Sequence, residues 1–184
     1  MGALGGRREE GYAARPDMKI YLAGPLFTTP EREFNVQLAT RLRSLGHEVF
    51  LPQETPASER TGKAIFLKDL VGLDWADGVV AIMDGADPDS GTCWECGYAY
   101  ATRKPVVLFR SDIRGSGDAD DIPFNAMLIG AADASIELPL ATVDEAATAI
   151  HAEVVRLSPG RSAGVEVPLK SRIKTRTTMP EVTR

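Results

Sequence analysis

The stretch GVVAIMDGADPDSGTCWECGYAYATRKPVVLFR, residues 78–110, decides the fold class. It begins and ends with short, almost wholly apolar runs, residues 78–84 and 105–110, each of the length of a buried strand. A polar turn and a segment of helical length lie between them. An apolar strand, a helix and a second apolar strand are typical of the unit that joins two parallel strands in a sheet covered on both faces.

The same alternation continues on both sides of this stretch. Three more strands are predicted from the apolar runs at residues 19–24, 47–52 and 134–138. Helices are predicted at residues 30–45, 61–73 and 142–157, with a short helical piece at residues 123–133. We therefore predict one flavodoxin-like or Rossmann-like α/β domain over residues 18–157, a three-layer sandwich around a five-stranded parallel sheet.

The two ends of the chain differ from this pattern. Residues 1–17 are rich in Gly, Ala and Arg and have no periodicity, so we expect a flexible leader; they lack the apolar segment of a signal peptide. Residues 158–184 hold six basic and two acidic residues. We expect a solvated basic tail there, with a basic arm on a neighbouring subunit as the alternative.

Composition narrows the classes of partner. A hydrophobic fraction of 43% and a charged fraction of 26% match an average globular protein. The net charge of -5 argues against nucleic acid or an anionic membrane as the main partner. No apolar run approaches the roughly 18 residues that a membrane span needs. Since two cysteines three positions apart cannot staple a fold, we expect a reduced, cytoplasmic protein.

Cys93 and Cys96 form a C-x-x-C motif that allows three interpretations. A thiol redox pair is disfavoured because the acidic residue inside the motif would raise a thiolate pKa. A zinc half-site needs two more ligands, and the two histidines, His47 and His151, lie on a strand start and a terminal helix. We prefer core packing, in one stripe with Gly97, Tyr100 and Ala101.

Glu95, between the two cysteines, also allows two interpretations. It fits the capping box Thr92-x-x-Glu95, in which it would bond to the start of its own helix. Alternatively it lies at the carboxyl edge of the sheet, where the helix N-terminus would keep it ionised, as a nucleophile attacking a sugar carbon requires. No glycine-rich phosphate loop occurs, which argues against NAD, FAD or ATP as a cofactor.

Two further acids stand out by position. Asp69 falls inside the apolar stripe formed by Ile65, Phe66, Leu70 and Leu73. An apolar surrounding would raise its pKa and suit it to protonate a leaving group; the alternative is a boundary residue bonded to a backbone N–H. Asp89 either supports a turn or bonds a substrate hydroxyl. These residues indicate glycosyl chemistry without a metal or cofactor.

The motifs IYLAGPLF, LKDLVGLDWADGVVAIMDG, PDSGTCWECGYAYATRKPVVLF and PFNAMLIG follow one another in this order. In this order they closely resemble the nucleoside 2-deoxyribosyltransferase family, over essentially all of residues 18–157. The resemblance implies a flavodoxin-like fold and no cofactor. It implies nucleotide salvage chemistry, in which the base of a 2′-deoxynucleoside is exchanged for a free nucleobase by a retaining, ping-pong route.

The resemblance also implies roles for the three acids. Glu95 would be the nucleophile that forms a covalent deoxyribosyl ester, and Asp69 would handle the base and its proton. Asp89 would bind the sugar hydroxyls together with Glu95.

Five other residues gain substrate-binding roles from the resemblance. Tyr21 would sit close to the nucleophile, and Phe27, in the segment that begins at Gly24, would stack near the base. Asn125 and Met127 would be lent to the site of an adjacent subunit. The protein is then expected to be a homo-oligomer with shared sites, built from dimers, with a hexamer as one option.

Some alternatives stay open at this stage. The loop at residues 53–60 matches no fixed family pattern, so base preference is open, and either Gln53 or Glu54 is a candidate for that contact. The resemblance extends to 5′-monophosphate N-glycosidases, in which serines facing the phosphate stand at the positions of Asp89 and Asn125. A non-catalytic nucleotide-binding or sensing module is the third option. The presence of all three carboxylates argues against the sensor.

Overall fold

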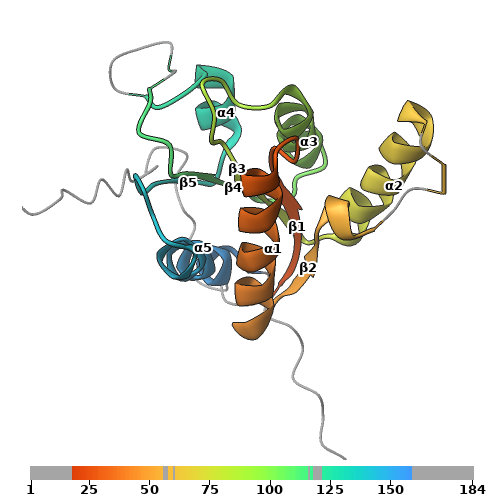
Figure 1. Ribbon diagram of the computed structural model, residues 1–184, viewed down its shortest axis with the longest axis horizontal. Helices are drawn as coiled ribbons and strands as arrows, with labels where there is room; N and C mark the ends of the chain where they lie inside the picture. The colour runs from red at the N-terminus through yellow and green to blue at the C-terminus, as the bar shows by residue number, and fades with distance from the viewer. Residues whose placement is uncertain (1–17, 56–57, 60, 116, 118–121, 159–184) are drawn as a thin grey trace, which may run out of the picture.

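Five parallel strands form the centre of the molecule (Figure 1). The computed structural model describes residues 18–55, 58–59, 61–115, 117 and 122–158. The strands are β1 (Lys19–Ala23), β2 (Glu48–Phe50), β3 (Gly78–Ile82), β4 (Val106–Arg110) and β5 (Ala134–Glu137). Their order in the sheet is β2-β1-β3-β4-β5, which is the flavodoxin-like order. The predicted fold class is confirmed.

Helices connect the strands and cover both faces of the sheet. They are α1 (Thr29–Ser44), α2 (Gly62–Trp75), α3 (Ser90–Ala101), α4 (Ala126–Ala131) and α5 (Val143–Leu157). A 3₁₀ turn, η1 (Pro52–Glu54), was not predicted; its first residue is a proline, whose fixed φ favours such a start. None of the described helices is long and apolar enough to cross a membrane. The predicted leader and nearly all of the predicted tail lie outside the described residues.

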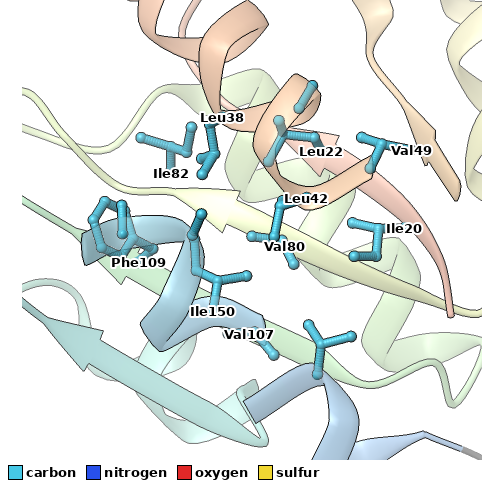
Figure 2. Close-up of a cluster of buried hydrophobic side chains, with 14 of the residues drawn as sticks. Ile20, Leu22, Leu38, Leu42, Val49, Val80, Ile82, Val107, Phe109 and Ile150 are labelled. Carbon is cyan, nitrogen blue, oxygen red and sulfur yellow. The ribbon is translucent and has the colours of Figure 1, made fainter. Parts of the chain in front are cut away.

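One face of the sheet packs against α1 and α5. Alternate residues of a strand point to opposite faces, so each inner strand gives every second side chain to this layer. Figure 2 labels ten side chains of this layer. Those from the strands are Ile20, Leu22, Val49, Val80, Ile82, Val107 and Phe109, and those from α1 and α5 are Leu38, Leu42 and Ile150. This layer holds the sheet together and contains none of the predicted site residues.

The other face packs against α3, α4 and the end of α2. In α3 the buried residues are Thr92, Cys96 and Ala99. Core packing is confirmed for Cys96, and Cys93 is half-buried, but the rest of the predicted stripe is wrong, since Gly97, Tyr100 and Ala101 are exposed. The helix turns the small side chains of Thr92, Cys96 and Ala99 to the strands, so it can approach the sheet closely. The larger Tyr100 side chain, which carries a hydroxyl group, faces solvent.

The prediction for α2 is wrong in a similar way. Of the expected apolar stripe, Leu73 is buried and Leu70 half-buried, whereas Ile65 and Phe66 are exposed. The first turns of α2 extend away from the sheet, and its C-terminal part makes the packing contact (Figure 1). A glycine is needed there, because a Cβ at Gly72 would come within 2.5 Å of the Phe50 ring.

Lys104 joins the end of α2 to the start of β4. Its Nζ donates to the carbonyl oxygens of Leu73, Asp74 and Ala76 at 2.7, 2.8 and 2.5 Å. The last carbonyls of a helix lack partners within the helix, and a cation is favourable at that end. The ammonium therefore anchors a helix that has few other contacts with the sheet.

Replacing Lys104 with methionine should lower the free energy of unfolding by about 1–3 kcal/mol, because three carbonyl oxygens lose a charged donor. Urea denaturation followed by circular dichroism measures the change. Arg103→Met is the matched control, since Arg103 is the exposed neighbour, and it should change the midpoint little. Equal stability of the Lys104 variant and the wild type would contradict the anchoring role.

Candidate active site

Glu95 lies in the second turn of α3, the helix that packs over β3 and β4. The hydroxyl of Tyr21, in the middle of β1, donates a hydrogen bond to Glu95 Oε1. Tyr21 is fully buried, and its ring stacks on Phe50 with centroids 5.5 Å apart. Burial, followed by the charge of Glu95, raises the Tyr21 pKa well above its usual range. The hydroxyl is therefore a permanent donor to the carboxylate.

The helix cap at the start of α3 is Asp89, not Thr92. Asp89 Oδ2 accepts from the Thr92 backbone N at 2.9 Å and from Thr92 Oγ1 at 3.1 Å. The capping-box interpretation of Glu95 is therefore wrong, since its carboxylate accepts a hydrogen bond from Tyr21 of β1 and does not bond to the start of its own helix. Asp89 does have the turn-supporting role considered for it, and both bonds use one of its two carboxylate oxygens.

The expectation that the helix N-terminus keeps Glu95 ionised also needs correction. Burial raises the Glu95 pKa to about 7. The Tyr21 hydrogen bond and the cation of Lys68 oppose the rise, and the charges of Asp69 and Asp89 add to it. The helix dipole acts mainly within the first turn, and Glu95 lies beyond it. The carboxyl group thus titrates near neutral pH, as is common for groups that do chemistry.

Asp69, on α2, has a charged partner that the sequence did not predict. Lys68 Nζ lies 2.8 Å from Asp69 Oδ1, and the two side chains are 16% and 20% exposed. The same ammonium donates to the Pro52 carbonyl oxygen of η1 at 2.8 Å. No backbone N–H bonds to Asp69 within the described residues, so the boundary-residue alternative is not supported. Its expected apolar surrounding is replaced by an ammonium.

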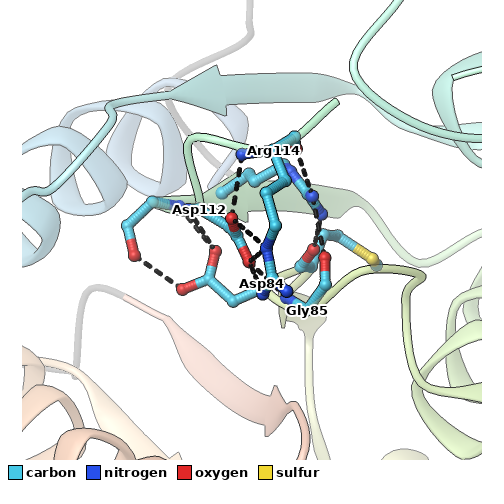
Figure 3. Close-up of polar contacts among 7 residues, drawn as sticks. Asp84, Gly85, Asp112 and Arg114 are labelled. Carbon is cyan, nitrogen blue, oxygen red and sulfur yellow. Dashed lines mark hydrogen bonds and ion pairs between the residues drawn. The ribbon is translucent and has the colours of Figure 1, made fainter. Parts of the chain in front are cut away.

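The loops after β3 and β4 are joined by a polar network (Figure 3). Asp84 Oδ1 accepts from the backbone N of Ser111 and Asp112 at 2.6 and 2.9 Å. In return, Asp112 Oδ2 accepts from the Gly85 backbone N at 3.1 Å. Gly85 has a φ of 120°, which favours glycine. The network fixes the start of the loop that leads to Asp89.

Arg110, at the end of β4, completes this network. It is 3% exposed, and its guanidinium donates to the carbonyl oxygens of Met83, Gly85 and Arg114. Arg114 in turn pairs with Asp112 and holds the pKa of that carboxyl well below its usual range. Arg110 is thus directed at backbone carbonyls rather than at a ligand.

The residues expected near the base lie around the loop after β1. Phe27 is 73% exposed, and its ring is available for a ligand. Gly24 lies against Ile82, whose Cβ is 3.1 Å from the position of an added Cβ. Of the two candidates in the next loop, Gln53 Nε2 bonds the Arg32 carbonyl oxygen at 2.8 Å, and Glu54 pairs with an arginine of α1.

No hydrogen bond joins Asn125 or Met127 to Glu95 within the described residues. Asn125 caps α4, and its Oδ1 accepts from the Met127 backbone N at 2.9 Å. The Met127 side chain is 80% exposed.

The two cysteines are free thiols. Burial raises the Cys96 pKa to about 12, and burial followed by the charge of Asp89 raises the Cys93 pKa. Both are therefore poor thiolates near neutral pH. Among the described residues, no group of three His, Cys, Asp or Glu side chains is placed to hold a metal ion. His47 and His151 contact one another at 2.9 Å between Nε2 and Nδ1, away from this face.

Comparisons with known proteins identify the family of the chain. The sequence model of the family "nucleoside 2-deoxyribosyltransferase" matches residues 20–127. A conserved protein from Enterococcus faecalis V583 is 27% identical, with a TM-score of 0.60, over 75% of this chain and 97% of that one. A 2-deoxyribosyltransferase from Bacillus psychrosaccharolyticus is 29% identical, with a TM-score of 0.55, over 74% and 95%.

A more distant structure shares the fold alone. The CMP N-glycosidase of Clostridium botulinum is 16% identical, with a TM-score of 0.52, over 72% of this chain and 97% of that one. A search of curated protein sequences gave no match.

Replacing Glu95 with glutamine should stabilise the protein at neutral and higher pH. The folded pKa of about 7 exceeds the ordinary value of 4.5, so the folded state holds a proton that the unfolded state releases between these values. Glu95 therefore lowers stability as pH rises through this range, by up to about 3 kcal/mol above pH 7. The gain in melting temperature should be full at pH 8 and vanish near pH 4.

Glu33→Gln, an exposed substitution on α1, is the control and should show no such pH dependence. A gain of the same size at pH 4 and pH 8 would contradict the assigned titration of Glu95.

Proposed function

The chain belongs to the nucleoside 2-deoxyribosyltransferase family, and from this premise we propose that it transfers a 2-deoxyribosyl group between nucleobases. The observation that carries the proposal is the carboxylate of Glu95, held by the buried Tyr21 hydroxyl and near the charges of Asp69 and Asp89. The substrates are small-molecule 2′-deoxynucleosides and free nucleobases. A cytoplasmic location stays a prediction from the sequence.

The proposed reaction has two displacements at one carbon. Glu95 attacks C1′ of the deoxyribose; the bond from C1′ to the base nitrogen breaks, and an ester bond to Glu95 forms. Asp69 gives a proton to the departing base. A second base then gives up its proton toward Asp69 and attacks C1′, which releases Glu95. Two inversions give net retention, as in retaining glycosidases.

Two of the three acids, Glu95 and Asp89, have a local setting that suits their proposed roles. Tyr21 lowers the Glu95 pKa through its hydrogen bond, which favours the ionised nucleophile. Asp89 uses Oδ2 to cap α3, and Oδ1 has no hydrogen bond within the described residues. That oxygen is the proposed acceptor for a sugar hydroxyl.

Transfer requires that the ester outlive the arrival of the second base, so water has to be excluded. Trp94, next to Glu95, stacks on Tyr98 and contacts the Phe66 ring edge-on, each at 5.5 Å between centroids. We assign this exclusion to Trp94, to the exposed ring of Phe27 and to Met127 of a neighbouring subunit.

A shared site also accounts for the position of Asn125 and Met127. An apolar side chain that is 80% exposed contributes little within its own subunit. On a homo-oligomer built from dimers, the start of α4 would close the pocket of the adjacent subunit. This assembly is part of the proposal.

Hydrolysis of a nucleoside 5′-monophosphate is the second candidate function, because the resemblance includes such enzymes. Asp89 argues against it, since a carboxylate there would face a phosphate that carries roughly two negative charges near neutral pH. Arg110 is a poor partner for that phosphate, because its Nη1 and Nη2 groups already donate to three carbonyl oxygens.

The first test incubates the protein with deoxyinosine, with and without free adenine, and follows the products by chromatography. Deoxyadenosine should form only when adenine is present. Glu95→Ala should lower the exchange roughly 10⁴-fold or more, because the nucleophile is lost. Glu33→Ala on α1 should leave it unchanged.

Without an acceptor, mass spectrometry should find a deoxyribosyl adduct on Glu95. An adduct on another residue, or substantial exchange by Glu95→Ala, would contradict the assignment.

The second test compares kcat/KM for deoxyadenosine and its 5′-monophosphate. The nucleoside should be preferred on the order of a hundredfold, because Asp89 repels the phosphate in a partly desolvated site. Asp89→Ser should reduce this preference. If the wild type prefers the monophosphate, the hydrolase is the better description; if Asp89→Ser leaves the ratio unchanged, the charge argument fails.

A further inference from the structure

We infer that Lys68 is a positioning residue for the reaction proposed above: its ammonium, held at Asp69, favours on Glu95 the negative charge that attack on C1′ requires. The inference rests on the proposed function for its role in the reaction. Its electrostatic part concerns three described side chains and can be tested without any turnover.

The position of the ammonium is fixed from two sides. Lys68 Nζ is 2.8 Å from Asp69 Oδ1 and 2.8 Å from the Pro52 carbonyl oxygen. The Lys68 side chain is 16% exposed, and Pro52 is buried. Exposed ion pairs of flexible side chains contribute little, whereas this pair is largely removed from solvent and held by a second bond.

The charges that act on Glu95 come from three parts of the fold. Tyr21 reaches it from β1, Asp69 and Lys68 lie on α2, and Asp89 stands at the start of α3. Two of these groups are carboxylates that oppose ionisation of Glu95, and Tyr21 supplies a neutral hydrogen bond. Among the described residues, Lys68 is the one cation that favours the ionised form.

Neighbouring carboxylates in a half-buried site cannot all be ionised at little cost. A cation bonded to one of them removes most of its effect on the others. Lys68 therefore acts on both acids of the mechanism: it forms an ion pair with Asp69 and acts on Glu95 through space. Lys68 also connects α2 to η1 through the Pro52 carbonyl oxygen. η1 begins the loop at residues 53–60, for which the sequence left open which base the enzyme would prefer.

The test is the pH dependence of kcat/KM for a nitrophenyl deoxyriboside, whose leaving group needs no proton, so that Asp69 drops out of the readout. In Lys68→Met the acid limb should move up by at most about one pH unit, since an opposite charge lowers a carboxyl pKa by about one unit or more at about 4–6 Å and by less at longer range. Activity below the limb should fall by up to about tenfold, and the alkaline plateau should change little.

Three further variants separate charge from structure. Lys68→Arg keeps the charge and should restore the wild-type limb. Lys68→Gln keeps a donor for the Pro52 carbonyl but loses the charge, so it should behave like Lys68→Met even where the methionine variant folds poorly. Lys63→Met removes an exposed lysine of the same helix, whose Nζ lies 5.1 Å from the Phe66 ring centroid, and should not move the limb.

Titration of the Glu95 carboxyl by carbon-13 NMR gives a second readout, with Glu95→Gln to assign the signal. The signal should titrate at higher pH in Lys68→Gln than in the wild type. An unmoved titration and acid limb, a uniform loss at every pH, or an equal shift in Lys63→Met would overturn the inference. If the wild type neither exchanges bases nor releases nitrophenol, the proposed function fails, and the NMR titration still decides the effect of Lys68.

Discussion

The hydrogen bond from the Tyr21 hydroxyl to Glu95 connects the central sheet to the proposed nucleophile. It lets an inner strand of the sheet hold a carboxylate that belongs to a helix, and it partly offsets the penalty of burying that charge. Burial still prevails, so the carboxyl group titrates near neutral pH. An ionised carboxylate at this position therefore lowers stability, and its neighbours limit that loss.

The rest of the site follows from the strand order. In a β2-β1-β3-β4-β5 sheet the loops after β1 and β3 diverge at the carboxyl edge, and ligands of such folds bind there. Phe27 comes from the first loop and Asp89 from the second. Asp69 is the exception, since α2 extends from the side of the sheet. The position of Asp69 depends on two lysines. Lys104 bonds to carbonyl oxygens at the C-terminal end of α2, and Lys68, the residue before Asp69, bonds to the Pro52 carbonyl oxygen.

The sequence was sufficient for the fold, because apolar strand runs and helical spacing report directly on what each segment buries. It was less informative about helix faces: in α3 the stripe was placed one position too late, and in α2 an apolar surface exposed in the subunit was taken for core. The link between Lys68 and Asp69 could not be predicted, since adjacent helix residues do not face one another by spacing alone. The three carboxylates were singled out by motif and by position, and their roles stay predictions. The protonation of Glu95 depends on its burial, which a motif does not show.

The polar network between the loops after β3 and β4 has a consequence for engineering. Asp84 accepts from one loop and Asp112 from the other, so the two segments share their hydrogen bonds and form a single rigid rim. A graft that replaced one segment from a relative would leave carboxylate oxygens and backbone N–H groups without partners on the segment that stayed. Attempts to widen substrate range at this edge should therefore exchange both segments as a cassette.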